Sequence, residues 1–106
     1  MPNIPVQVEK TIIAYLESVS KIIPIDKAIL FGSYAKGNYD DNSDIDLAIF
    51  SSYFDNLDRI DSFRLLFLKA MEFPLDLQPQ PFTKEDMLNP EGIVTEIFKT
   101  GVEIKM

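Results

Sequence analysis

The chain has 106 residues, 46% of them hydrophobic, with 10 Lys and Arg against 17 Asp and Glu and no His or Cys. This length suits one domain, so residues 1–106 are expected to fold as a single unit. Without Cys and His, the chain cannot form zinc fingers, iron–sulfur clusters or disulfides, nor Ser-His-Asp or Cys-His catalytic groups. Any metal would be a hard cation bound through oxygen.

The formal net charge of -7 argues against direct nucleic-acid binding, because phosphates are bound by basic surfaces. The sequence has no apolar run long enough for a membrane span, and its N-terminus lacks an export signal. We therefore expect a cytoplasmic protein that does not enter a membrane.

The N-terminal third predicts a helix, a strand and a very short helix. Apolar residues at three- and four-residue spacing predict an amphipathic helix over residues 6–23, stopped by Pro24. The apolar segment 27–31 predicts a buried strand that runs into a tight turn. A short helix from Ser33 would then end near Gly37, which suits a left-handed C-terminal position.

The remainder alternates strands and helices. Residues 44–50 alternate acidic and apolar side chains and predict a strand, which a long helix follows over 57–73. Residues 74–82 predict an edge strand because of two prolines, and residues 91–100 predict a last helix. Between them, Thr83 and Asp86 have the spacing of a helix-capping box. The fold class is α/β (α+β), a small mixed sheet flanked by helices.

The helix at 57–73 is more apolar than one buried face requires. A stripe at helical spacing predicts its buried face: Leu57, Ile60, Phe63, Phe67 and Met71. Further leucines, Leu65, Leu66 and Leu68, widen the apolar surface beyond that stripe. The extra surface fits either a larger core or a partner interface, including a homodimer through helix 57–73.

Two sequence motifs contain residues that could bind a phosphate or a metal ion. Gly32 allows the main chain to approach a phosphate closely, and Ser33 adds a hydroxyl and a backbone N–H; alternatively, Ser33 only caps a helix. Asp44 and Asp46 lie two residues apart on a strand, so their carboxylates share one face and could bind a divalent cation. The pair could equally be an exposed strand face, and Asp76 alone is an ordinary surface residue.

The segment ILFGSYAKGNYDDNSDIDLAIF, residues 29–50, resembles the signature of the DNA polymerase beta-type nucleotidyltransferases. The short length and the final helix resemble the minimal nucleotidyltransferase (MNT) group in particular. The resemblance implies the nucleotidyltransferase fold and the transfer of a nucleotide from ATP at two Mg²⁺ ions. It implies that Asp44, Asp46 and Asp76 are catalytic metal ligands.

The resemblance also implies a nucleotide-binding set: Gly32, Ser33, Lys36 and Ser43. The family often has Arg where this chain has Tyr34 and Lys36. Lys keeps a positive charge but lacks the bidentate fork of Arg, so nucleotide affinity is expected to be lower. Tyr34 either packs or shields the triphosphate.

In the minimal group the partner is usually a HEPN-type RNase toxin, so the resemblance implies an antitoxin in a heteromeric complex. As an enzyme, the protein would transfer AMP to a toxin hydroxyl, with Tyr the favoured acceptor. As a binding module, it would neutralise the toxin by contact through its acidic and leucine-rich surfaces. A third possibility is a small-molecule nucleotidyltransferase that works with a separate helical subunit. Three mutually repelling carboxylates favour the enzyme.

Overall fold

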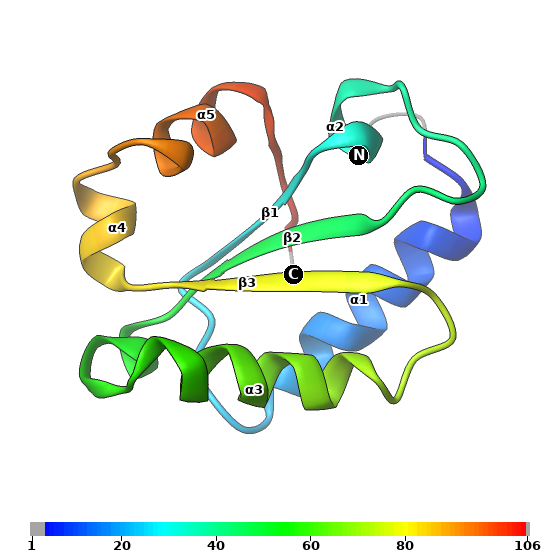
Figure 1. The fold of residues 1–106 in the computed structure, drawn as a ribbon. Helices are drawn as coiled ribbons and strands as arrows, with labels where there is room; N and C mark the ends of the chain where they lie inside the picture. Colours follow the sequence, from blue (N-terminus) through cyan, green and yellow to red (C-terminus); the bar gives the residue numbers. More distant parts are fainter. Residues whose placement is uncertain (1–3, 106) are drawn as a thin grey trace.

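A computed structural model describes residues 4–105, in which four strands form one mixed sheet in the order β3-β2-β1-β4 (Figure 1). The strands are β1 Lys27–Phe31, β2 Ile45–Phe50, β3 Leu77–Phe82 and β4 Val102–Glu103. The helices are α1 Val6–Ser20, α2 Ser33–Lys36, α3 Arg59–Ala70, α4 Lys84–Leu88 and α5 Ile93–Thr100, with a 3-10 helix η1 at Ser52–Asn56. β2 pairs antiparallel with β1 and parallel with β3. This arrangement confirms the expected mixed sheet flanked by helices.

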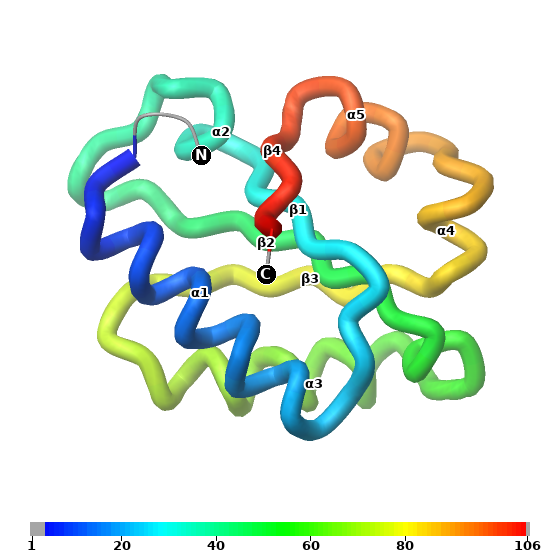
Figure 2. The backbone as a smooth tube through the Cα atoms, turned by 180° about the vertical axis from the view of Figure 1, so that it is seen from behind, coloured from blue at the N-terminus to red at the C-terminus, as the bar shows by residue number. Residues whose placement is uncertain are grey.

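The two faces of the sheet have separate apolar cores. α1 and α3 cover one face, and α1 crosses it in Figure 2. The predicted stripe of α1 is buried there in full: Val8, Ile12, Tyr15, Leu16, Val19 and Ile23. The helix itself ends at Ser20, before the expected residue 23, and a turn leads to Pro24. On the opposite face, Phe50 and Phe82 of the sheet pack with Val94 and Ile97 of α5.

The prediction for the buried face of the long helix is wrong. In α3 the buried residues are Ser62, Leu66 and Ala70, one stripe at four-residue spacing. The predicted stripe lies mostly at the surface, with exposed fractions of 67% for Ile60, 37% for Phe63, 38% for Phe67 and 66% for Met71. Ser62 and Ala70 have small side chains, which let the helix lie close to the sheet.

Two short elements were absent from the sequence-based expectation, namely η1 and β4. β4 pairs antiparallel with β1 and completes the sheet on that side. The expected capping box at Thr83 is present, since Thr83 and Asp86 each accept a hydrogen bond from the other's backbone N–H. None of the helices within residues 4–105 has both the length and the apolar character needed to cross a membrane.

The prolines of β3 lie on the outer edge of the sheet, as expected. The Ile45 N–H donates to the Asp76 carbonyl oxygen over 2.9 Å. In a parallel ladder this register turns the N–H groups of residues 78, 80 and 82 toward β2 and those of 77, 79 and 81 away from it. Pro79 and Pro81 therefore cost the sheet no hydrogen bond, because the N–H groups that they lack would point outward.

Candidate active site

The turn after β1 brings the main chain against a carboxylate. Gly32 has φ 76° and ψ -153°, a conformation open to glycine only. A Cβ atom at this position would overlap the Asp46 carboxylate. Gly32 is also the N-cap residue of α2, without a side-chain capping bond, and Ser33 is the first helical residue. The alternative in which Ser33 caps the helix is therefore not what the structure shows.

The parallel pairing of β2 and β3 gathers the three predicted carboxylates. Asp46 lies on β2 opposite Gln78, Asp44 directly precedes β2, and Asp76 directly precedes β3. The carboxyl groups of Asp44 and Asp76 are close enough to interact, and the charges of both act on Asp46. Asp46 is partly buried, whereas Asp44 and Asp76 are exposed. The site is thus open to solvent on one side and closed by Gly32 on the other.

This crowding changes the acid–base properties of Asp44 and Asp46. The hydrogen bond with Asp76, followed by its repulsion, raises the pKa of Asp44 above the ordinary carboxyl value. Burial raises the pKa of Asp46, and repulsion by Asp44 and Asp76 adds to it. Both carboxyl groups consequently bind protons more tightly than in an unfolded chain. Keeping both groups ionised costs free energy, and a bound cation offsets this cost.

Gln78 is a site residue that the sequence analysis did not identify. Its Nε2 donates a hydrogen bond to Oδ1 of Asp76 over 2.8 Å. The sequence could have identified Gln78, because it lies two residues after Asp76 and residues two apart on a strand share a face.

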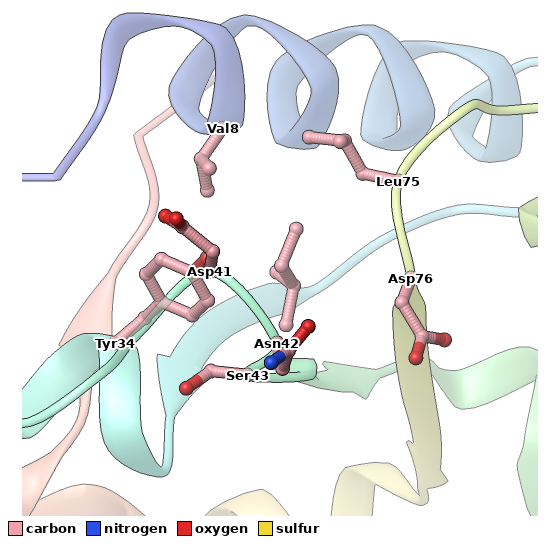
Figure 3. A pocket seen from close by; sticks show the side chains of 8 residues that line it. Val8, Tyr34, Asp41, Asn42, Ser43, Leu75 and Asp76 are labelled. Atoms are coloured by element: carbon pink, nitrogen blue, oxygen red, sulfur yellow. The ribbon is translucent and has the colours of Figure 1, made fainter.

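A hollow of about 260 Å³ opens beside Asp76, the one of the three acids that lines it (Figure 3). Tyr34 and Asp76 lie on opposite sides of it, and Val8 and Leu75 form an apolar wall. The Tyr34 ring is buried and stacks on Tyr39 with a centroid separation of 4.4 Å, so Tyr34 packs within the fold.

The other two predicted nucleotide-binding residues are Ser43, which directly precedes Asp44 in the chain, and Lys36, which lies in α2. Ser43 lines the same hollow, and its hydroxyl accepts a hydrogen bond of 2.9 Å from the Asp40 N–H, which shapes the loop before β2. Lys36 is exposed in the last turn of α2 and forms no ion pair with any residue in the described range 4–105. Its ammonium group is therefore available to an anion.

The donor set matches a hard divalent cation, because three carboxylates supply only oxygen ligands. Within residues 4–105, however, no three acidic side chains are arranged so that they could hold an ion as they stand. The residues that would bind Mg²⁺ are Asp44, Asp46 and Asp76. Their side chains would have to adjust to a bound ion.

A mixed sheet that brings a Gly-Ser turn and three carboxylates to one end of adjacent strands defines a nucleotidyltransferase-type domain. The family model described as "Polymerase beta, Nucleotidyltransferase" matches residues 10–105, and the chain belongs to this family. The expected family is therefore confirmed.

Two solved structures are similar to the chain. One is a protein from Sulfolobus solfataricus described as a nucleotidyltransferase. It has 18% sequence identity and a TM-score of 0.72, and the match covers 92% of this chain and 79% of that chain. This likeness supports the assignment of the fold. The other is described as a toxin-antitoxin with AMP-PNP; it has 27% identity and a TM-score of 0.57 over 90% of this chain and 70% of its own. The comparison with curated proteins found no match.

Proposed function

We propose that this protein is a Mg²⁺-dependent nucleotidyltransferase that transfers AMP from ATP to a hydroxyl of a partner protein. We further propose that the partner is a HEPN-type RNase toxin, which the transfer silences. The convergence of Asp44, Asp46 and Asp76 beside Gly32 carries this proposal. The similarity to a toxin-antitoxin structure that contains AMP-PNP supports the nucleotide and the class of partner.

The residues divide into two groups. Gly32, Ser33, Lys36 and Ser43 hold the triphosphate through main-chain N–H groups, hydroxyls and one ammonium group. The three aspartates hold two Mg²⁺ ions. When bound, such ions lower the pKa of the acceptor hydroxyl and neutralise charge on the leaving pyrophosphate.

In the transfer, the acceptor oxygen forms a bond to the α-phosphorus of ATP. The bond from that phosphorus to the bridging oxygen of the β-phosphate breaks, and pyrophosphate leaves. Asp76 takes the hydroxyl proton, which explains how the site works without a His. Gln78 keeps the Asp76 carboxylate in place through their hydrogen bond.

A second candidate is an antitoxin that neutralises the toxin by contact alone. The exposed apolar side chains of α3 favour this possibility, because they offer a surface for a partner whether or not chemistry follows. The two candidates differ in whether Asp44 and Asp46 are needed.

The test uses ATP labelled at the α-phosphate, Mg²⁺ and the product of the adjacent reading frame, which we propose to be a HEPN-type toxin. We expect label on the toxin with the wild-type chain and none with Asp44→Asn/Asp46→Asn. Glu17→Gln removes an exposed acidic group of α1 and serves as the matched control. If the double variant and the wild type neutralise the toxin equally and neither labels it, contact is the mechanism.

A further inference from the structure

The outer side of α3 carries an apolar surface that no described element covers. We name the four side chains Ile60, Phe63, Phe67 and Met71 the α3 stripe. They repeat at the spacing of one helix face, and the rings of Phe63 and Phe67 stack with centroids 5.6 Å apart. α3 forms the lower edge of the molecule in Figure 1. Aromatic side chains held in place on a helix lose little conformational entropy when a partner covers them.

The α3 stripe leads to the candidate active site. At one end, Ile60 and Phe63 line a hollow of about 260 Å³ beside Pro81. At the other end, Phe67 and Met71 line a second hollow of about 180 Å³ that reaches Asp76. Leu75 and Asp76 also line the hollow shown in Figure 3. A protein that covers the stripe would therefore lie against Asp76.

The neighbouring strand cannot recruit a partner by adding a strand. Pro79 and Pro81 leave the outer edge of β3 without N–H donors at those positions. The N–H of Leu77 donates to the Leu75 carbonyl oxygen over 2.9 Å, and the Pro81 carbonyl oxygen accepts from Arg59 over 3.0 Å. Binding on this side of the molecule therefore has to use side chains, which are those of the α3 stripe.

Charge distinguishes between the two kinds of protein that could cover the α3 stripe, a second copy of this chain and a different, basic protein. Beside the stripe, Asp61 pairs with Arg64 and Lys69 pairs with Glu72, each at 3.6 Å, so the local rim is balanced. The whole chain carries a net charge of -7, and a second copy would bring the same charge against it. A basic partner instead gains from the long-range attraction.

We infer that the α3 stripe is the docking surface for the acceptor protein, a basic protein that covers Ile60, Phe63, Phe67 and Met71 with an apolar face of its own. Docking on this side places its acceptor hydroxyl beside Asp76. The inference rests on the proposed function for its acceptor, and it adds the surface that selects that acceptor.

The test compares Phe63→Asp/Phe67→Asp with Leu88→Asp/Ile93→Asp. The second pair changes two exposed apolar residues of α4 and α5, on the opposite face of the sheet. Binding to the HEPN-type toxin is measured by calorimetry, AMP transfer by label, and ATP affinity by titration of each variant alone. Sedimentation of each chain alone reports self-association.

For the stripe variant we expect toxin binding about tenfold weaker or more. The KM for toxin should rise by a similar factor, with little change in kcat and with ATP affinity within twofold of wild type. The α4–α5 variant should match wild type throughout. Unchanged ATP affinity also shows that the stripe variant is folded.

Several results would overturn the inference: equal toxin binding by both variants, no toxin binding by wild type, or a wild-type homodimer that only the stripe variant dissociates. If wild type binds the toxin through the stripe without labelling it, the docking surface stands and the proposed transfer fails. If transfer persists unchanged in the stripe variant, the proposed function stands and the docking surface is wrong.

Discussion

Gln78 fixes the orientation of Asp76, because its Nε2 donates to Oδ1 of that carboxylate over 2.8 Å. Gln78 also lies opposite Asp46 in the β2–β3 register, so one amide side chain adjoins two of the three acids. The site therefore depends on a neutral residue as well as on its carboxylates.

Replacing Gln78 should impair transfer more than folding. We expect Gln78→Ala to lower the rate of AMP transfer about tenfold or more, as removing a hydrogen-bond partner of a metal-binding residue generally does. Gln80→Ala, two residues further along the same face of β3, is the matched control. Equal rates in the two variants, measured with labelled ATP, would show that the Gln78 hydrogen bond has no role in the reaction.

Gly32 and Gly37, the glycines at the two ends of α2, distinguish the effect of backbone strain from that of steric overlap. Both have positive φ, 76° at Gly32 and 82° at Gly37, but a Cβ meets the Asp46 carboxylate at Gly32 and nothing within 4 Å at Gly37. We expect Gly37→Ala to lower the free energy of unfolding by about 1–2 kcal/mol and to retain nucleotide binding. Gly32→Ala should lose more stability and should lose nucleotide binding, in urea unfolding and ATP titration respectively.

The crowded carboxylates give a pH-dependent difference in stability. Because the folded-state pKa of Asp44 and Asp46 is raised, the folded protein gains stability from protonation below the ordinary carboxyl pKa and loses it as pH rises through the raised pKa. In Mg²⁺-free buffer, Asp44→Asn/Asp46→Asn should resemble wild type in acid and become the more stable protein toward neutral pH. A gap in urea midpoint between the two proteins that stays constant with pH would contradict this expectation.

A buried hydrogen bond joins the two helices on one face of the sheet. The Tyr15 hydroxyl donates to the Leu66 carbonyl oxygen over 2.8 Å, and burial raises the pKa of this phenol. Tyr15→Phe should lower the free energy of unfolding by about 1 kcal/mol while keeping the ring contact with Phe73. Tyr53→Phe, which changes an exposed ring, should have an effect within about 0.5 kcal/mol in the same urea titration.

Local patterns in the sequence predicted the elements whose signals are local. The stripe of α1, the end of α2 at Gly37 and the capping box at Thr83 depend on residues a few positions apart. The two-residue strand β4 depends instead on pairing with the distant β1. Pairing between segments far apart in the chain leaves no periodicity in so short a segment.

The same reasoning explains the error in α3. The helix has one small-residue stripe around Ser62 and Ala70 and one strongly apolar stripe around Phe63 and Phe67. Hydrophobicity alone selects the second, but the close approach of the helix to the sheet needs the first. At the candidate site, the spacing of Asp44 and Asp46 was readable, whereas their approach to Asp76 follows from the parallel register of β2 and β3.

The outward prolines of β3 also affect how the protein behaves at high concentration. An open sheet edge can template endless stacking of identical chains, but Pro79 and Pro81 interrupt that edge and β4 at the other side is only two residues long. Neither edge of the sheet therefore favours the growth of a fibre by strand pairing.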